Sequence, residues 1–173
     1  MPWETIKPTN YQRVPGGINI WNYLLKDNGY DVPPMRTGSP EGITITFVPI
    51  YQFLYEKQRP TDITSRQIEH LDPNGLIPNY FITFDSIWQV LEDTRCWQKS
   101  DGSTNDKTIA LAISTADCLI PPMYKQVPIN MAAKLTAYLL KKYKLTISDI
   151  KITKDHPEVF QWKEFKRVVL KGS

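Results

Sequence analysis

Residues 130–143 read NMAAKLTAYLLKKY, and this stretch predicts the longest helix of the chain. Its apolar residues recur at spacings of three and four, which places them on one face of a helix. The residues of this stripe are Ala132, Leu135, Leu139 and Tyr143. We expect a helix over about residues 129–144, with the stripe buried against a sheet.

Strand patterns lie on both sides of this helix in the sequence. Residues 42–48, GITITFV, alternate apolar and polar side chains, which is typical of a strand. Further strands are expected over 80–84, 87–91 and 108–113, and at Ile150 and Ile152, with the second and third segments joined as a hairpin. Strands separated by helices predict an α/β fold, with a mixed central β-sheet flanked by helices.

The first forty residues are rich in proline and glycine and predict an N-terminal arm. Ile18, Trp21, Leu24 and Leu25 have helical spacing, so the arm is expected to contain one short helix over 18–27. A second short helix is expected over 61–71. The predicted organisation is an arm over 1–40 and a domain over 41–173, which together form one globular unit.

Composition favours an ordinary globular protein: hydrophobic residues make up 41% of the 173 residues and charged residues 23%. No apolar run approaches the roughly 20 residues that a membrane-spanning helix needs, so no membrane partner is expected. The first residues, MPWE, lack the basic and apolar regions of a signal peptide, and we expect a cytoplasmic protein. The net charge of +3 is small for binding a nucleic acid polymer.

The residues alone show no catalytic set. The chain has two histidines, His70 and His156, whereas a zinc site normally takes three or four histidine, cysteine or carboxylate ligands. The two cysteines, Cys96 and Cys118, have no metal-ligand spacing and are expected to be apolar core residues. Phosphate-loop, dinucleotide and hydrolase motifs are missing from the sequence.

Several segments together resemble a known family. The strand at 42–46, the hairpin at 80–91, the loop that begins at Trp97, the strand at 108–113 and the helix at 130–143 follow one another in the same order. In this order they resemble the zinc-dependent N-acetylmuramoyl-L-alanine amidases of phage endolysins and related peptidoglycan-recognition domains. The resemblance covers about residues 40–170, and it implies an amidase-like fold.

The resemblance also implies that the zinc ligands of the family are replaced. The two zinc histidines fall on Thr46 and Thr153, and the third ligand falls near Gln161. The glutamate of one central strand falls on Ala112, and only Tyr80 matches a residue that is catalytic in some members. Neutral hydroxyl and amide oxygens do not replace imidazole and thiolate on Zn²⁺. We therefore expect a pseudoenzyme with no catalytic residue, no metal and no cofactor.

The leading hypothesis is that the vacated cleft binds a small polar or anionic ligand, such as a nucleotide signal or a muropeptide. The protein would be encoded by a phage or prophage, and sequestering a host defence messenger would be one use. The expected ligand-binding residues are Thr46, Tyr80, Thr153 and Gln161 on the floor of the cleft, Trp97, Gln98, Lys99 and Asp101 on its rim, and Lys154 near the rim. Their hydroxyl, amide and aromatic groups suit hydrogen bonding to a small polar ligand and stacking on it.

Two alternatives stay open. The chain could be an interaction or virion assembly module that contacts a host or phage protein through its N-terminal arm. It could also be a working amidase with an unusual metal site that includes Asp155, His156 and a cysteine. The sequence does not predict the oligomeric state.

Overall fold

The structure of the chain, a computed structural model, describes residues 5–6, 11–48, 63–64, 75–82, 86–114, 126–154, 157 and 160–172. Its centre is a seven-stranded sheet in the order β11-β4-β10-β6-β7-β3-β2. These strands span Tyr11–Val14 (β2), Ile18–Asn22 (β3), Gly42–Val48 (β4), Tyr80–Ile82 (β6), Ile87–Gln89 (β7), Thr108–Ser114 (β10) and Ile150–Ile152 (β11). Strands β11, β4, β10 and β6 are parallel, whereas the β6–β7 and β2–β3 pairs are antiparallel. The sheet is therefore mixed, and the predicted α/β class is confirmed.

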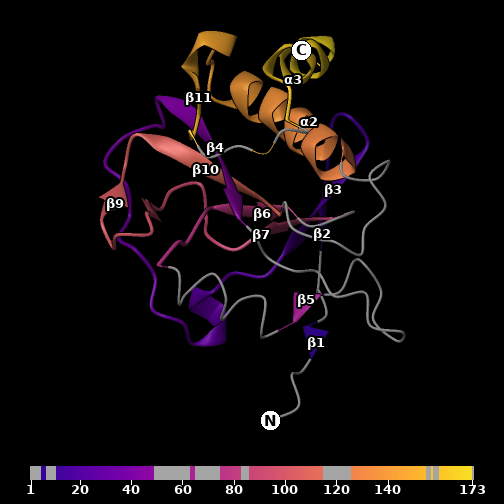
Figure 1. Cartoon of the computed structure of the whole chain (residues 1–173). Helices are drawn as coiled ribbons and strands as arrows, with labels where there is room; N and C mark the ends of the chain where they lie inside the picture. The colour runs from indigo at the N-terminus through magenta and orange to yellow at the C-terminus, as the bar shows by residue number, and fades with distance from the viewer. Residues whose placement is uncertain are drawn as a thin grey trace.

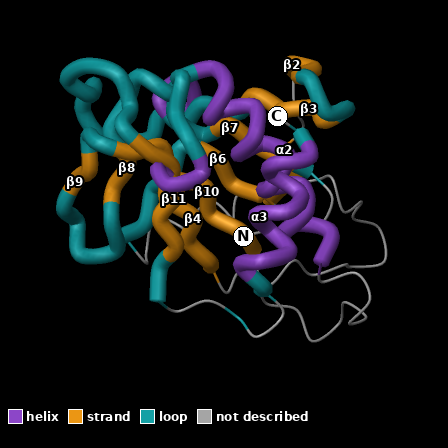
Figure 2. The backbone as a smooth tube through the Cα atoms, turned by 90° about the horizontal axis from the view of Figure 1, so that it is seen from above, coloured by secondary structure: helices purple, strands orange, loops and turns teal. Residues whose placement is uncertain are grey.

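Two α-helices lie over one face of this sheet (Figures 1 and 2). The long helix α2 spans Gln126–Lys142, and the C-terminal helix α3 spans Trp162–Lys171 and packs against it. Two short 3-10 helices are also present, η1 at Lys26–Asn28 and η3 at Ile147–Asp149. Two small antiparallel pairs, β1 (Thr5–Ile6) with β5 (Ile63–Thr64) and β8 (Trp97–Gln98) with β9 (Thr104–Asn105), complete the described elements.

Strand β10 is buried along its whole length because both faces of the sheet are covered. Its isoleucines and Leu111 belong to a helix-side core that also contains the buried stripe of α2. Ala110 and Ala112 point the other way, into a second core around Trp88 and Phe81, which we call the opposite core. Successive side chains of a strand point to opposite faces, so each central strand supplies both cores.

The prediction of a helix over 18–27 is wrong, because Ile18–Asn22 form strand β3. Gly16 and Gly17 have positive φ angles of 101° and 75°, which form the tight turn between β2 and β3. Pairing with β7 then buries Ile18 and Ile20 on one face. Residues 11–22 therefore belong to the same sheet as β4 and β10, and only η1 in this region is helical.

Other segment predictions have mixed outcomes. The hairpin, the strands at 42–48 and 108–113, and the last short strand are confirmed, although residues 83–85 lie outside the described part. Helix α2 is confirmed but begins three residues earlier than expected, with Pro128 tolerated in its first turn.

In the predicted helix over 61–71, Ile63–Thr64 are a strand, and the rest lies outside the described residues. Helix α3 was not predicted.

The expectation for one of the two cysteines is met within the described residues. Cys96 is a buried free thiol, as expected for an apolar core residue, while Cys118 lies outside the described part. No helix in the described ranges is both long enough and apolar enough to cross a bilayer.

Candidate functional site

The structure brings Thr46 and Thr153 together near the carboxyl ends of two neighbouring strands. Strands β4 and β11 are parallel, with Ile152 beside Ile45. Beyond β11, the Thr153 N–H donates a hydrogen bond of 3.1 Å to the Ile45 carbonyl oxygen, so Thr153 lies next to Thr46. Both threonines are half-buried. The structure therefore places these two candidate site residues side by side.

The donor groups at this point do not fit a zinc ion. The side chains of Thr46 and Thr153 offer neutral hydroxyl oxygens, which hold Zn²⁺ poorly compared with imidazole or thiolate. Gln161 is exposed and begins α3 as its N-cap residue, with its carbonyl oxygen accepting the Phe165 N–H at 2.9 Å. No group of three or more histidine, cysteine or acidic side chains gathers anywhere in the described part of the chain. His70, Asp155 and His156 lie outside that part.

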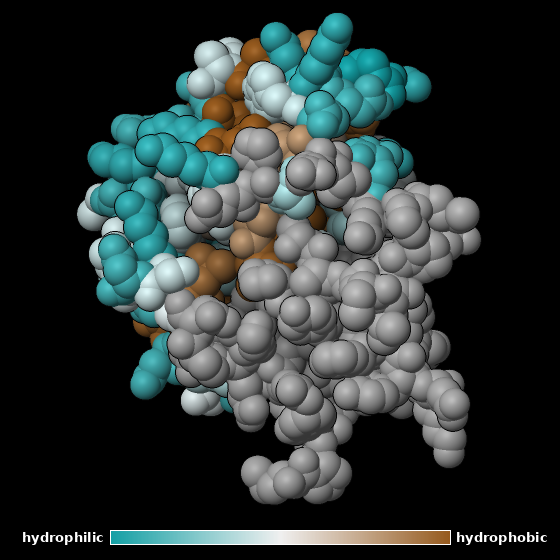
Figure 3. All heavy atoms as spheres, in the orientation of Figure 1, coloured by the Kyte–Doolittle hydropathy of each residue, from teal (hydrophilic) through white to brown (hydrophobic). Residues whose placement is uncertain are grey.

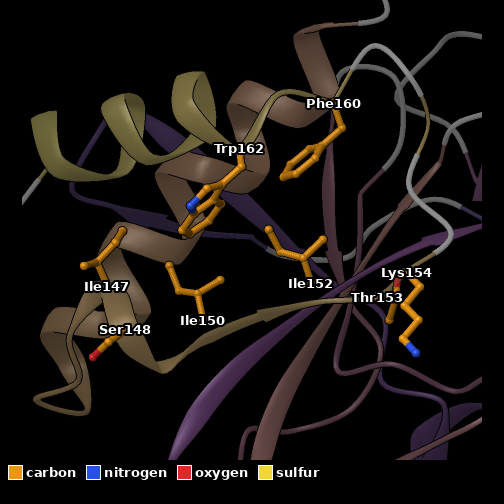
Figure 4. Close-up of a pocket in the computed structure, with 8 residues that line it drawn as sticks. All are labelled: Ile147, Ser148, Ile150, Ile152, Thr153, Lys154, Phe160 and Trp162. Atoms are coloured by element: carbon orange, nitrogen blue, oxygen red, sulfur yellow. The ribbon is translucent and has the colours of Figure 1, made fainter.

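A groove of about 550 Å³ lies on the helix side of the edge strand β11, and Thr153, but not Thr46, is among its lining residues. Its floor is Ile150 and Ile152, and Phe160 and Trp162, at the start of α3, form a wall (Figure 4). Hydrophobic surface is visible between η3 and α3 in the space-filling view, with hydrophilic side chains around it (Figure 3). The lining residues are Ile147, Ser148, Ile150, Ile152, Thr153, Lys154, Phe160 and Trp162.

The aromatic wall of the groove is held by ring contacts. Phe160 lies 5.2 Å from Phe47 and 5.3 Å from Phe165, measured between ring centroids, and is buried. Trp162 stacks on Phe165 at 6.0 Å and remains 40% exposed. An indole that is braced on one face and open on the other is a platform for stacking. Among the described lining residues Lys154 is the one cation, and none of them carries a carboxylate.

Trp97 and Gln98, expected on the rim of the cleft, are held inside the fold. Trp97 is 5% exposed, and its indole N–H donates to Thr108 Oγ1 at 3.0 Å. The side-chain amide of Gln98 donates to the Gly75 carbonyl oxygen at 2.9 Å. The expectation that Trp97 offers a free stacking face is wrong, because its ring packs in the opposite core.

Lys99 and Asp101 lie on the exposed turn that connects β8 and β9. Asp101 Oδ1 accepts hydrogen bonds from both the backbone N–H and the hydroxyl of Ser103. These hydrogen bonds lower the pKa of Asp101. The carboxylate therefore stabilises its own turn, and neither residue lines the groove beside β11.

Tyr80 lies on the helix side of the sheet, away from Thr46. It is 2% exposed, and its register partner on β10 is Leu111, a residue of the helix-side core. Its phenol donates a hydrogen bond of 2.6 Å to Asp93 Oδ1. Burial, followed by the charge of Asp93, raises the pKa of Tyr80 well above its ordinary value. The structure does not bring Tyr80 to the surface that Thr46 and Thr153 share.

Asp93 is the centre of a polar cluster that the sequence did not reveal. Besides Tyr80, the phenol of Tyr143 donates to Asp93 Oδ2 at 2.5 Å, and Lys142 Nζ lies 3.3 Å from the same oxygen. Beside this cluster, the buried guanidinium of Arg36 donates to the carbonyl oxygens of Asp93, Arg95, Asp106 and Thr108. A cavity of about 250 Å³ borders Arg36, Asp93 and Tyr143.

Little in the sequence pointed to these missed residues. Asp93 and Arg36 carry no motif, and they meet only because the chain packs residue 36 against residues 93–108. The groove was closer to prediction, because Ile150 and Ile152, which form its floor, were expected in a strand. The signal for α3 itself was available in Phe165, Val168 and Val169, which recur at helical spacing.

Comparison with solved structures reveals where this architecture occurs elsewhere. The PlyG catalytic domain is 16% identical, with a TM-score of 0.61 over 88% of this chain and 94% of that domain. The Staphylococcus aureus hydrolase AmiA, solved in complex with its ligand, is 13% identical, with a TM-score of 0.58 over 87% of this chain and 80% of AmiA. A mutant endolysin from Bacillus subtilis is 15% identical, with a TM-score of 0.58 over 88% and 99% of the two chains.

These similarities confirm the fold expected from the sequence, that of amidase-type endolysin catalytic domains. No protein-family model matches the chain, and no match to a curated protein was found.

Proposed function

We propose that this amidase-fold protein binds a small anionic ligand in the groove beside β11 and does not hydrolyse peptidoglycan. One observation carries the proposal: a groove of about 550 Å³ combines an apolar floor, an open indole, a lysine and the hydroxyl of Thr153. This volume lies within the roughly 300–1,000 Å³ that is usual for small-molecule sites.

The chemistry at Thr46 and Thr153 supports the lack of hydrolysis. Attack on an amide by a zinc enzyme needs a metal-bound water whose pKa is lowered to about 7. Neutral hydroxyls give the metal too little charge donation to replace the usual ligands. Tyr80 does not compensate, since its phenol is buried and bound to Asp93.

The groove favours a ligand with an aromatic ring and a negative charge. A planar base would stack on Trp162 and lie over Ile150 and Ile152. A phosphate or carboxylate would reach Lys154 and the hydroxyl of Thr153 at the other end of the strand (Figure 4). A nucleotide has both features, and we take nucleotides as the first ligand class, with muropeptides as the second.

Calorimetric titration tests the proposal with a panel of nucleoside monophosphates, cyclic dinucleotides and a muropeptide. We expect at least one nucleotide to bind wild-type protein, and Trp162→Ala and Lys154→Ala each to weaken that binding by about tenfold or more. Lys134→Ala is the matched control, because Lys134 is also exposed but lies on α2 and does not line the groove. Titrations without heat from any nucleotide or muropeptide would refute the proposal, as would equal losses in the control.

The biological setting belongs to the same proposal. A phage or prophage that encodes this protein would use it in the cytoplasm of the infected bacterium to sequester a nucleotide messenger of host defence. Lysates of cells that produce the protein, analysed by mass spectrometry of its bound small molecules, would identify the natural ligand.

A further inference from the structure

The two helices that cover the sheet concentrate positive charge on one side of the molecule. Helices α2 and α3 together contain seven lysines and arginines and one acidic residue, a balance of +6, whereas the whole chain carries +3. The rest of the chain therefore has a balance of −3. Charge of one sign on one layer favours an anionic partner on that side.

Helix α3 supplies most of this charge on its outer side. Its inner side is apolar, with Phe165 and Val169 buried in the helix-side core. Hydrophilic side chains gather over its outer side in the space-filling view (Figure 3). We call this outer side the cationic face, and its exposed residues are Lys163, Lys166, Arg167, Leu170 and Lys171. Residues three and four apart on a helix are neighbours, so these five side chains form one continuous patch.

Helix α2 extends the patch. The two helices run side by side (Figures 1 and 2). A Cβ atom at Gly172, just beyond α3, would come within 3.1 Å of the Ala137 Cβ on α2. Lys134 and Lys141 lie three residues before and four residues after Ala137, and both are exposed. Both helices therefore present lysines beside their line of contact.

Most of these charges are not neutralised within the protein. Glu164 is the one acidic residue of the two helices, and it pairs with Arg167. Within the described part of the chain, no ion pair involves Lys163, Lys166 or Lys171. These three ammonium groups are therefore available to an external anion.

Leu170 indicates which kind of anionic partner fits. Its apolar side chain is 50% exposed, and its neighbours on the helix surface are Lys166 and Arg167. An apolar side chain among cations suits a bilayer, which combines anionic headgroups with an apolar interior. A nucleic acid favours aromatic side chains for stacking, and the exposed aromatic residue of α3, Trp162, lines the groove beside β11.

We propose that the cationic face of α3 holds the protein on the surface of an anionic lipid bilayer, with Leu170 inserted among the headgroups. The lysines and Arg167 contact lipid phosphates, and their long stems keep the charges at headgroup level. We expected no membrane partner from the lack of a spanning apolar run, but a surface contact needs no such run. The cationic face shares no residue with the groove beside β11, so bilayer contact and nucleotide binding are separate properties.

Co-sedimentation with vesicles tests the proposal on the full chain. One set of vesicles is phosphatidylcholine alone, and the other is phosphatidylcholine with an equimolar amount of phosphatidylglycerol. We expect wild-type protein to sediment with the anionic vesicles only, and the bound fraction to fall as salt is added, because salt screens exposed charges. Protein that binds neither set, or both sets equally, would overturn the proposal.

Two triple variants remove the same charge from different surfaces. One replaces Lys163, Lys166 and Lys171 with glutamine. Each cation near an anionic bilayer changes affinity by about fivefold, so we expect a loss of about 100-fold. The control replaces three exposed cations that lie outside α2 and α3, namely Arg13, Lys26 and Lys99. The control should lose less than about fivefold. Equal losses would show that only net charge matters and would overturn the assignment to α3.

Leu170→Gln tests whether the partner is a bilayer. It should weaken binding to anionic vesicles several-fold, because the inserted apolar side chain is lost. Its melting temperature should stay near that of wild-type protein, since the position is half exposed on a helix. Titration of a single-stranded RNA, followed by fluorescence anisotropy, is the second arm. Unchanged vesicle binding in Leu170→Gln, or RNA binding in the absence of vesicle binding, would overturn the bilayer assignment.

Discussion

At the scale of single residues, buried polar groups near the amino-terminal ends of the central strands are satisfied by partners distant in sequence. Arg36 donates to four carbonyl oxygens, and all four belong to residues at least 57 positions away from it along the chain. Asp93 receives two phenols and a lysine. Such groups were not predictable, because each partner is chosen by tertiary packing and not by local pattern.

Arg36→Met should destabilise the protein by about 3 kcal/mol or more, because it leaves several buried carbonyl oxygens without a donor. The free energy of unfolding in urea measures this. Arg167→Met is the control: Arg167 is exposed and pairs with Glu164 on the same helix, so its loss should cost less than about 1 kcal/mol. Similar losses in the two variants would show that the carbonyl cluster contributes little.

Alkaline pH should weaken the fold through the two tyrosines that bind Asp93. Burial is the largest cause that raises the pKa of Tyr80 and of Tyr143 above the ordinary value of 10.0. A raised folded-state pKa gives stability that is fully present below pH 10 and is lost as pH rises above it. Melting temperatures measured from about pH 8 to 11 should therefore fall more steeply in wild-type protein than in Tyr143→Phe. Parallel pH profiles would contradict this cause.

At the scale of elements, the spacing of apolar residues along the chain decided which helix and strand predictions succeeded. The apolar stripe of α2 is long enough to show helical spacing without ambiguity. Strand β4 shows a short alternation of apolar and polar residues, and strand β10 has an apolar run from Ile109 to Ile113, and both patterns are typical of strands. Residues 18–25 carried both periods, since Ile18 and Ile20 alternate while Ile18, Trp21 and Leu25 fit a helix. Pairing with β7 resolved the conflict in favour of a strand, and this partner was not visible locally.

Leu139→Ala in α2 should cost about 2–5 kcal/mol of unfolding free energy, because Leu139 is fully buried in the helix-side core. Thermal or urea unfolding followed by circular dichroism measures the loss. Lys141→Ala, two residues further along and exposed, should change stability by no more than about 0.5 kcal/mol. A small cost at Leu139 would mean that α2 packs loosely on the sheet.

At the scale of the whole molecule, the fold was largely predictable and the site was predictable only in part. The order of motifs predicted the architecture that the solved endolysin domains share. The adjacency of Thr46 and Thr153 followed from the same order. The positions of Tyr80 and Trp97 did not follow, because the face on which a side chain lies and its final depth depend on packing.

Purified wild-type protein should contain far less than one zinc per chain and should not clear cell walls in a zymogram with added zinc. The reason is the neutral donor set at Thr46 and Thr153. Elemental analysis and the zymogram check this, with an active endolysin as positive control. Stoichiometric zinc together with a cleared band would restore a hydrolytic role.

The strand order has a consequence for synthesis on the ribosome. Both sheet neighbours of β4, namely β10 and β11, come later in the chain, at residues 108 and 150 onward. Strand β4 therefore cannot pair with a neighbouring strand of the sheet until residues 108–114 of β10 have been translated. Pairing between strands that are distant in sequence slows folding. During that delay the nascent chain would expose the apolar, unpaired β4 segment, which chaperones could bind.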